Sequence, residues 1–547
     1  MKRFLCRFGI LLIATISLQN AYTQTNNNFE ISKSMEMYLS VFRELNLNYV
    51  DEIQPSKLNE TAINAMLDGL DPYTVFIPES DIEDFQLMTT GEYGGIGSLI
   101  QQIGDYVYVS EPYEGFPAQK SGMIAGDRIV EVNGVDAKGK TTAQISELLK
   151  GQPGSTVDVK LIREGIENPF VTTLTREKIK IDNIPYQTVF ENGIGYVRLT
   201  GFTQKAAAEL KEVLLNMKKQ TELKGFIIDL RSNGGGLLNE AVDIANIFVD
   251  KGELIVNTKG KTEDRTTIHR TRQAAVDLDI PLIVMVNESS ASASEIVAGS
   301  LQDLDRAVII GQRTFGKGLV QNVVPLSYNT QLKVTVAKYY IPSGRCIQEL
   351  DYSKHGDKIP DSLISTFKTR AGRIVHDGGG VMPDVKLEPI EFSTVSSNLY
   401  GGNFIFRFAN QYARTHSKIE PADKFCIDDS TYQEFIDFVK KEKFSYTTES
   451  ERMISKLKEI AASESYLEAV QTQLNQLESE LIEYKQNDLS KHRNEIEELL
   501  NVEIVTRYYY QKGKIKAALK NDPELKKAIE ILLDQKLYKS LLTADSK

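Results

Sequence analysis

The stretch LIVMVNESSASASEIVAGS, residues 282–300, decides which fold is expected for the centre of the chain. Its first five residues are apolar and predict a buried strand, and a helix is expected after the serine-rich turn. A strand followed by a turn and a helix indicates an α/β domain. At such a turn the hydroxyl of Ser292 would be exposed, close to free backbone N–H groups of the helix. A simpler explanation exists, because Ser292 and Glu295 match the S-x-x-E pattern of a capping box.

A second segment, GQRTFGKGLVQ at residues 311–321, offers a base for a serine nucleophile. Lys317 lies between two glycines, but a solvated lysine has a pKa of about 10.4 and is a poor base at neutral pH. A pKa near 7 requires roughly 4–5 kcal/mol of differential stabilisation of the neutral amine, which burial against apolar neighbours could supply. In a strand, Gln321 would share a face with Lys317 and could orient its nitrogen. The same pattern also fits a surface lysine in a hairpin.

A third segment, DLRSNGGG at residues 229–236, follows an apolar run that predicts a buried strand. A helix is expected after it, from about residue 237 to residue 248. Backbone N–H groups of a glycine turn at a helix start can bind an oxyanion. The alternative is a tight turn that only allows close packing of helix and strand. The segment does not match G-x-G-x-x-G, which makes a dinucleotide site a weak alternative.

The composition narrows the possible chemistry. The chain has 547 residues, with five histidines, three cysteines, no tryptophan, 41% hydrophobic residues and 25% charged residues. Such a chain can form several packed domains. It has no CxxC pair and no HExxH motif, so we expect no zinc site of the usual kind and no cofactor. The net charge of −11 argues against a nucleic-acid backbone as the main partner. Hydrolytic chemistry would therefore need a base other than histidine.

The N-terminus has the pattern of an export signal. Three basic residues, Lys2, Arg3 and Arg7, precede the uncharged run 8–18. This run has the length of a signal-peptide core and is too short for a comfortable transmembrane helix. Residues 1–23 are therefore predicted to be a signal peptide, with an uncleaved anchor as the alternative. The expected location is outside the cytoplasm, in the periplasm or associated with the envelope, and no stable membrane span is expected.

The rest of the chain divides by pattern into four regions. Residues 30–90 are predicted to be helical, and residues 91–166 to form a compact domain of strands with two short helices. Residues 180–400 are predicted to be α/β, and residues 405–547 to be a charged helical tail. Within the tail a heptad-like stripe favours a helix packed on its own chain over an intermolecular coiled coil. The stripe consists of Leu467, Val470, Leu474, Leu477, Leu481 and Tyr484.

Taken together, these segments resemble the carboxyl-terminal processing peptidases, the tail-specific serine proteases of peptidase family S41. Residues 290–295 are similar to the family's nucleophile motif, with Ser292 at the nucleophile. Segment 311–321 is similar to its lysine motif, 25 positions further on, with Lys317 at the general base and Gln321 at the residue that orients it. Segment 229–236 resembles the family's D-L-R-x-N-P-G-G turn, with Gly234 in place of the usual proline.

The resemblance implies an α+β multidomain chain. Its parts would be a crotonase-like α/β serine protease core with an inserted PDZ domain, a helical N-terminal region and a helical C-terminal tail. The N–H groups of Gly235 and Ala293 are the expected oxyanion hole. Asp303 falls where some members have an aspartate linked to activity, and Glu295 either shares such a role or only caps the helix. The carboxylate-binding loop of the PDZ domain would contain Gly94, Gly95, Ile96 and Gly97.

The function implied is that of a serine endopeptidase with a Ser/Lys dyad. It would recognise exposed apolar C-terminal tails of protein substrates through the PDZ domain and process or degrade these proteins. The helical tail could bind an adaptor or self-associate. One alternative is a catalytically inactive PDZ scaffold that binds protein C-termini. Another is a Ser-His-Asp protease, although none of its candidate histidines has a matching sequence context: His269, His355, His376, His416 and His492.

Overall fold

The computed structural model describes residues 28–352, 357–358 and 360–544, so the predicted signal segment lies outside the described residues. The chain divides into two compact units between residues 76 and 77. In the first unit, residues 28–48 form a helix and α2 (Pro55–Asp68) follows it, as the sequence predicted. The second unit contains α3 (Ile82–Thr90) and all of the domains described below. No helix of the described residues is long and apolar enough to cross a membrane.

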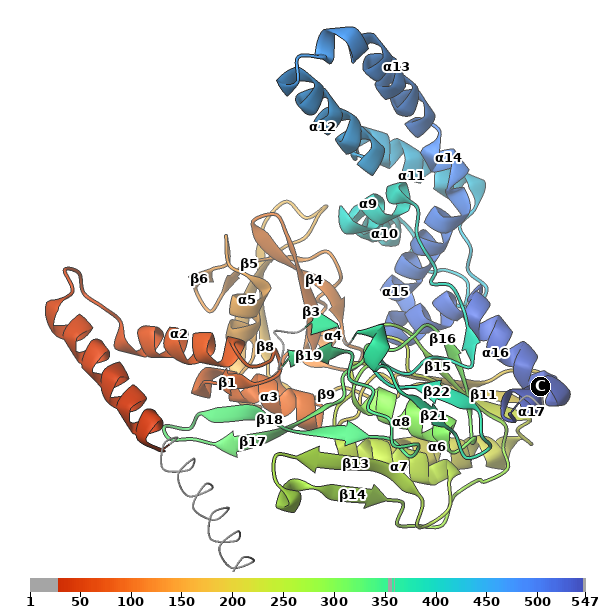
Figure 1. Cartoon of the computed structure of the whole chain (residues 1–547). Coiled ribbons are helices and arrows are strands. Elements are labelled where there is room, and N and C mark those ends of the chain that lie inside the picture. The colour runs from red at the N-terminus through yellow and green to blue at the C-terminus, as the bar shows by residue number, and fades with distance from the viewer. Residues whose placement is uncertain (1–27, 353–356, 359, 545–547) are drawn as a thin grey trace, which may run out of the picture. The chain divides into compact units, whose positions relative to one another are not determined.

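The centre of the second unit is a mostly parallel sheet with the strand order β10-β11-β12-β15-β16-β23. Figure 1 labels β11, β15 and β16 of this sheet. β10 pairs antiparallel with β11, and the other neighbours pair in parallel. β12, β15 and β16 are buried along their whole length, which explains why they read as continuous apolar runs. The bounds are β10 (Tyr186–Val189), β11 (Ile194–Arg198), β12 (Gly225–Asp229), β15 (Leu282–Val286), β16 (Val308–Gly311) and β23 (Val385–Lys386).

Helices cover both faces of this sheet. On one face, side chains such as Ile228 and Val284 pack with α6, α7 and α8. On the other face, Ile227 and Ile283 pack against α16 and α17. The sequence grouped these last two helices with a separate tail, whereas they form the outer layer of the α/β core. Their bounds are α6 (Ala206–Gln220), α7 (Leu238–Phe248), α8 (Ala293–Asp303), α16 (Pro523–Leu533) and α17 (Gln535–Leu541).

A second sheet contains a long hairpin. Its strands β17 and β18 pair antiparallel, and β18 also pairs with β13, which pairs with β14. The register of the hairpin shifts between Val320 and Gln321, which marks a bulge or irregularity there. The bounds are β13 (Leu254–Gly260), β14 (Thr267–Arg270), β17 (Leu319–Pro325) and β18 (Gln331–Tyr340). Shorter elements are β1 (Val75–Ile77), β19 (Leu350–Asp351), β20 (Asp357–Lys358), β21 (Thr366–Lys368) and β22 (Ile374–His376).

The region after α3 forms the compact domain of strands that the sequence predicted. Its antiparallel sheet has the order β3-β4-β5-β7-β8, so β3 lies at one edge. Both expected short helices are present, and α5 packs against β3. Before and after this sheet, β2 (Glu92–Gly95) pairs with β9 (Glu177–Lys180). The other bounds are β3 (Ser98–Ile103), β4 (Tyr106–Pro112), α4 (Pro117–Lys120), β5 (Arg128–Val132), β6 (Val135–Asp136), α5 (Thr142–Leu149), β7 (Thr156–Ile162) and β8 (Phe170–Thr175).

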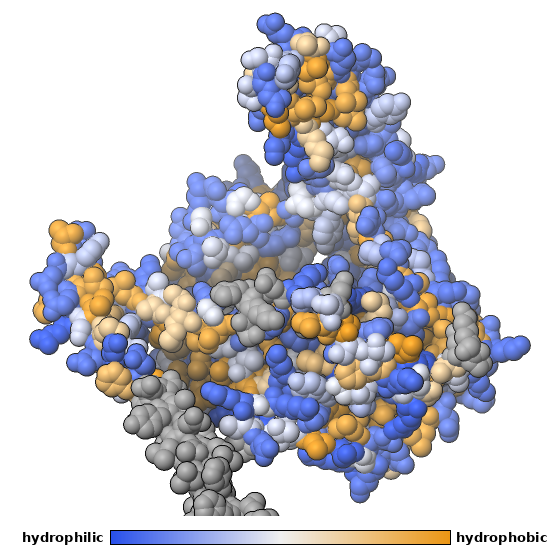
Figure 2. Space-filling model, viewed as in Figure 1, coloured by the Kyte–Doolittle hydropathy of each residue, from blue (hydrophilic) through white to orange (hydrophobic). Residues whose placement is uncertain are grey.

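The C-terminal helices form a separate core around aromatic residues such as Phe408 and Phe435, whose ring centroids lie 5.1 Å apart. The heptad-like stripe lies on α13, which packs against α12 of the same chain. Of the stripe residues Leu474 is buried, whereas Val470, Leu477 and Tyr484 are exposed, so packing of the whole stripe on its own chain stays a prediction. Apolar residues gather on the outer surface of this helix pair (Figure 2). The bounds are α9 (Thr394–Gly401), α10 (Phe404–Thr415), α11 (Asp429–Lys441), α12 (Glu449–Ser463), α13 (Leu467–Lys485), α14 (Asp488–Lys491) and α15 (Arg493–Leu519).

Candidate active site

The serine-rich turn joins β15 to α8, and its serines differ in their contacts. Ser290 and Ser294 are fully buried, and their hydroxyls donate to the carbonyl oxygens of Leu230 (2.8 Å) and Asn233 (2.9 Å). These two hydrogen bonds connect the turn to the glycine segment 229–236. Ser292 is half-buried and has a φ of 57°, a conformation that non-glycine residues rarely adopt. Such strain is often found at functional sites, which makes Ser292 the candidate nucleophile of the turn.

The three segments singled out in the sequence meet at one cavity of about 480 Å³. Ser292, Lys317 and Gln321 line this cavity together. Gly235 and Ala293, the expected oxyanion donors, line it as well. This volume is in the range of ligand-binding pockets, so the nominated residues share a space large enough for part of a substrate. The apolar wall of the cavity includes Phe85, Met88, Leu237, Leu238, Ile296 and Leu319.

Glu295 connects the serine turn to the lysine segment. Its carboxylate is fully buried and accepts hydrogen bonds from the backbone N–H groups of Ser292 (2.8 Å) and Lys317 (2.9 Å). It also accepts from the N–H of Gly316 (2.7 Å) and the hydroxyl of Thr314 (2.6 Å). Burial raises the pKa of the Glu295 carboxyl, and these hydrogen bonds act in the opposite direction. Glu295 thus caps α8 and also fixes the spacing between the two candidate catalytic segments.

Tyr339 forms a second connection between the same segments. Its hydroxyl donates to the carbonyl oxygen of Lys317 at 2.7 Å and lies 3.2 Å from the carbonyl oxygen of Ser292. The side chain is almost fully buried, so its position is fixed by packing. Tyr339 thus binds the backbone carbonyl groups of Ser292 and Lys317, and Glu295 binds their backbone N–H groups.

The glycine segment reaches the serine turn so closely that a side chain would not fit. A Cβ atom on Gly235 would lie 2.7 Å from the carbonyl oxygen of Ala291 and 2.9 Å from the backbone nitrogen of Ala293. Gly235 also has a φ of +100°, which favours glycine. Its N–H donates to the side-chain oxygen of Asn233 at 2.9 Å. In this conformation Asn233 therefore engages one of the two expected oxyanion donors.

The lysine segment is also held by close packing. A Cβ atom on Gly316 would lie 2.7 Å from Cβ of Glu349, so the loop before Lys317 needs glycine there. Lys317 is half-buried and precedes the first residue of β17 by two positions. Gln321 donates from its amide to the hydroxyl of Thr335 at 3.2 Å. The expected strand alternation therefore does not extend from Lys317 to Gln321, although both residues line the cavity.

Comparisons with known proteins decide the family. The model of "Peptidase family S41" matches residues 193–354, that of "PDZ domain" matches residues 108–163, and that of "Probable PDZ-protease, C-terminal helical domain" matches residues 395–532. The "Carboxy-terminal-processing protease" of Bartonella bacilliformis is 35% identical over 343 residues, which cover 62% of this chain and 78% of that protein. The chain belongs to peptidase family S41.

Two further proteins are similar to this chain. The "Probable CtpA-like serine protease" of Staphylococcus aureus (strain COL) is 34% identical over 376 residues, covering 67% of this chain and 73% of that protein. The solved structure titled "photosystem II D1 C-terminal processing protease" is 32% identical, with a TM-score of 0.36, and covers 64% of this chain and 87% of that one. The expected architecture of an S41 core with a PDZ domain and a C-terminal helical domain is confirmed.

In the PDZ domain, Gly94 and Gly95 end strand β2 and pair with β9, so only Ile96 and Gly97 of the expected loop 94–97 connect to the edge strand β3. The carbonyl oxygens of Ile96 and Gly97 accept from the N–H groups of Ala118 (2.8 Å) and Tyr113 (2.9 Å), which fixes the loop. Gly97 has a φ of +71°, and a Cβ atom there would lie 2.6 Å from Cβ of Phe116. Among the described strands, β3 pairs with β4 alone, which leaves its other edge for an added strand.

Asp303 lies away from the S41 cavity. Its carboxylate is buried at the end of α8, where it pairs with Arg345 at 2.8 Å and accepts from the N–H of Ser343 at 2.9 Å. These contacts attach the end of α8 to the loop before residue 345. Among the described residues, no histidine lines the cavity, and His355 lies outside them.

A charged cluster behind the glycine segment is a feature that the sequence did not reveal. The Arg231 guanidinium contacts Asp229 (2.7 Å), Asp522 (2.7 Å) and Glu524 (2.6 Å). Burial alone would raise the pKa of Asp229, but Arg231 and Arg198 hold it well below its ordinary value. Glu524 also accepts from the side-chain amide of Gln312 at 2.6 Å. The start of α16 therefore contacts both the glycine segment and the segment that leads to Lys317.

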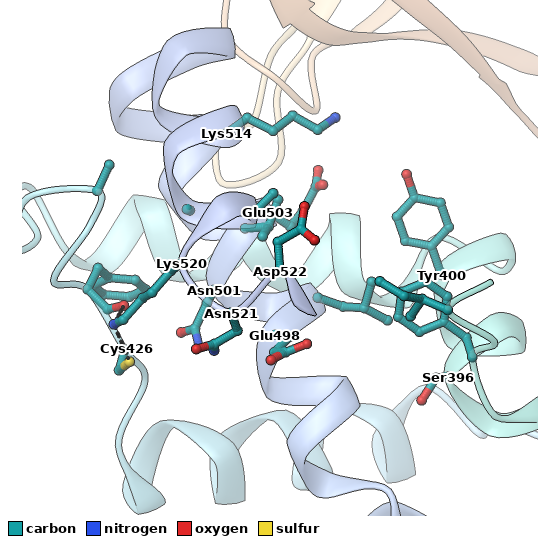
Figure 3. A pocket seen from close by; sticks show the side chains of 18 of the residues that line it. Ser396, Tyr400, Cys426, Glu498, Asn501, Glu503, Lys514, Lys520, Asn521 and Asp522 are labelled. Atoms are coloured by element: carbon teal, nitrogen blue, oxygen red, sulfur yellow. Dashed lines mark hydrogen bonds between the residues drawn. The ribbon is translucent and has the colours of Figure 1, made fainter. Parts of the chain in front are cut away.

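The same part of α16 borders a second cavity, of about 680 Å³, in the C-terminal helical domain (Figure 3). Asp522 and Glu503 lie near its centre, and Lys520 donates to the Cys426 thiol at 3.1 Å on one side. None of the residues that the sequence nominated for catalysis lines this cavity. The catalytic candidates therefore belong to the smaller cavity.

Glu524→Gln should lower the free energy of unfolding by about 2 kcal/mol, because Arg231 loses one of its buried carboxylate partners. Cleavage of a short peptide should also slow, since the glycine segment and Gln312 lose a common attachment. Urea unfolding and peptide turnover measure the two effects. Glu530→Gln is the matched control, because Glu530 lies exposed on the same helix and pairs with Lys527 at the surface. Equal effects of the two substitutions would contradict this interpretation.

Proposed function

We propose that this S41 protein is a serine endopeptidase in which Ser292 is the nucleophile and Lys317 is the general base. The observation that carries the proposal is that both residues line one cavity, while the Glu295 carboxylate accepts from the backbone N–H of each. This arrangement sets the distance between the two segments before substrate binds, as preorganised catalysis requires. Gln321 lines the same cavity and would orient the lysine side chain.

In the proposed reaction, the neutral amine of Lys317 accepts the proton of the Ser292 hydroxyl, and the serine oxygen attacks the peptide carbonyl carbon. The oxyanion is held by backbone N–H groups, with Ala293 at the start of α8 as the first donor. Gly235 would be the second donor once Asn233 releases or shares its N–H. The lysine proton passes to the leaving amine when the C–N bond breaks. Water, deprotonated by the same lysine, then hydrolyses the acyl-enzyme.

The substrate is proposed to be a protein with an exposed apolar C-terminal tail. The tail would add as a strand to the free edge of β3, beside α5, and its carboxylate would bind the backbone of loop 94–97. The carbonyl contacts of Ile96 and Gly97 support this placement, because they hold the loop in one conformation. Main-chain pairing would supply affinity, and apolar side chains of β3 and α5, such as Ile100 and Leu148, would supply the preference for apolar residues.

The proposal is tested with a folded protein that carries an added apolar tail. Wild-type enzyme and Ser292→Ala are incubated with it, and the products are identified by mass spectrometry. The proposal expects new internal termini with wild type alone, and faster cleavage with the tail than without it. Cleavage by both enzymes, or by neither, would contradict the proposed nucleophile. Tail binding without cleavage by either enzyme would instead support the scaffold alternative.

Gly97→Val should reduce cleavage of the tailed protein at least about tenfold more than cleavage of a short untailed peptide. A valine would be strained at this φ and would collide with Phe116, so the carboxylate loop would have to move. The ratio of kcat/KM for the two substrates is the measurement. Gly104→Asn is the control, because Gly104 lies in an open turn of the same domain and asparagine tolerates its φ of +59°. A similar loss on both substrates would remove the proposed role of the loop.

A further inference from the structure

Lys333 faces the catalytic cavity from the β17–β18 hairpin. It lies on β18 opposite Val323 of β17, and both residues line the cavity with Ser292 and Lys317. The next pair on the same face of the hairpin is Gln321 and Thr335, whose side chains are hydrogen-bonded. Lys333 therefore lies on the side of the hairpin that faces the candidate catalytic residues.

The charged residues that line this cavity are all positive. Its described lining residues include two lysines, Lys317 and Lys333, and neither aspartate nor glutamate. Among the described residues, Lys333 has neither an ion pair nor a side-chain hydrogen bond. Burial lowers the pKa of its ammonium, since no nearby carboxylate compensates for the lost hydration. A carboxylate that entered the cavity would supply that missing partner.

We infer that Lys333 forms a subsite for a carboxylate of the bound peptide within the catalytic cavity. This inference rests on the proposed protease function and specifies its substrate. A charge-assisted hydrogen bond to a partly buried ammonium is stronger than the same contact at an open surface. Lys317 acts as a neutral base in the proposed reaction, so Lys333 supplies the lasting positive charge. The carboxylate can come from an acidic side chain near the scissile bond or from the free end of the peptide.

The inference is tested with short peptides that differ only in charge. Glutamate and glutamine are exchanged at each position around the scissile bond, and every peptide is made with a free and with an amidated C-terminus. The readout is the ratio of kcat/KM for the charged and the neutral member of each pair, measured with the same enzyme. Wild type should favour the charged member about tenfold in at least one pair. A tenfold ratio corresponds to the free energy of one strong contact.

Substitutions of Lys333 then show whether this lysine causes the charge preference. Lys333→Met should bring the ratio close to one, and Lys333→Glu should invert it, so that the neutral member of each pair is favoured. Lys338→Met is the matched control, because Lys338 is an exposed lysine of the same strand and does not line this cavity. It should leave the ratio unchanged. Comparing ratios within one variant removes the effect of any partial unfolding.

The outcomes separate this inference from the proposed function. A preference that disappears on amidation identifies the terminal carboxylate, and one that survives amidation identifies an acidic side chain. Cleavage that depends on Ser292 but shows no charge preference, or a preference that Lys333→Met leaves intact, would overturn the subsite while the protease function stands. Cleavage of the neutral peptides by Ser292→Ala would overturn the proposed function itself.

Discussion

Ser292→Ala and Lys317→Ala should each lower kcat/KM for a short peptide by at least about a thousandfold, and the double variant should be no worse than either single one. The losses should not add, because in the proposed dyad the lysine acts only by removing the serine proton and the serine reacts only when that proton is removed. Turnover of a quenched fluorescent peptide measures the rates. Thermal unfolding of each variant, together with retained binding of a tail peptide, shows that the fold and the PDZ domain are intact.

Two controls use residues near the same segments. Ser289→Ala changes an exposed serine of the same turn, and Lys338→Ala changes an exposed lysine of β18. Both should leave the rate within about twofold of wild type, as expected for surface substitutions. If Lys317→Ala kept its activity while a histidine substitution removed it, a Ser-His-Asp mechanism would replace the dyad. If Ser292→Ala kept full activity, the nucleophile would lie elsewhere.

The strands and turns of the S41 core could be predicted because short, local sequence patterns determine them. Buried parallel strands such as β12 and β15 read as apolar runs, and the glycines of segment 229–236 mark a turn. The choice of Ser292 among four serines needed the family resemblance, because a capping box explains the S-x-x-E pattern equally well. The structure shows the Glu295 half of that cap in place, with further contacts to the lysine segment.

The contacts that the sequence did not reveal all depend on long-range packing. Arg231 and Glu524 are 293 positions apart. The sequence around either residue contains no pattern that predicts their contact. Regular strand alternation predicts a shared face for Lys317 and Gln321, but the register shift at Val320 and Gln321 interrupts this alternation. Lys333 lies in an ordinary strand pattern, and its position in the cavity follows only from how β17 and β18 pair.

Glu295→Gln should lower kcat/KM by about a hundredfold and the free energy of unfolding by about 3 kcal/mol, because buried donors are left without an acceptor. The glutamate presents two acceptor oxygens, and each accepts two hydrogen bonds from the serine and lysine segments. Glutamine keeps one of these oxygens. Its amide NH₂ would replace the other and would face two donors, so the segments would move apart.

The rate of covalent labelling of Ser292 by a serine-directed fluorophosphonate separates positioning from stability. Measured well below the unfolding temperature, labelling of Glu295→Gln should slow in parallel with turnover, since the serine and its base are no longer held together. Glu295→Asp keeps the charge on a shorter side chain and should recover part of the labelling rate. Glu288→Gln, at an exposed position of the same turn, should label like wild type. A stability loss with an unchanged labelling rate would reduce Glu295 to a helix cap, because the spacing of the two catalytic segments would then not depend on its carboxylate.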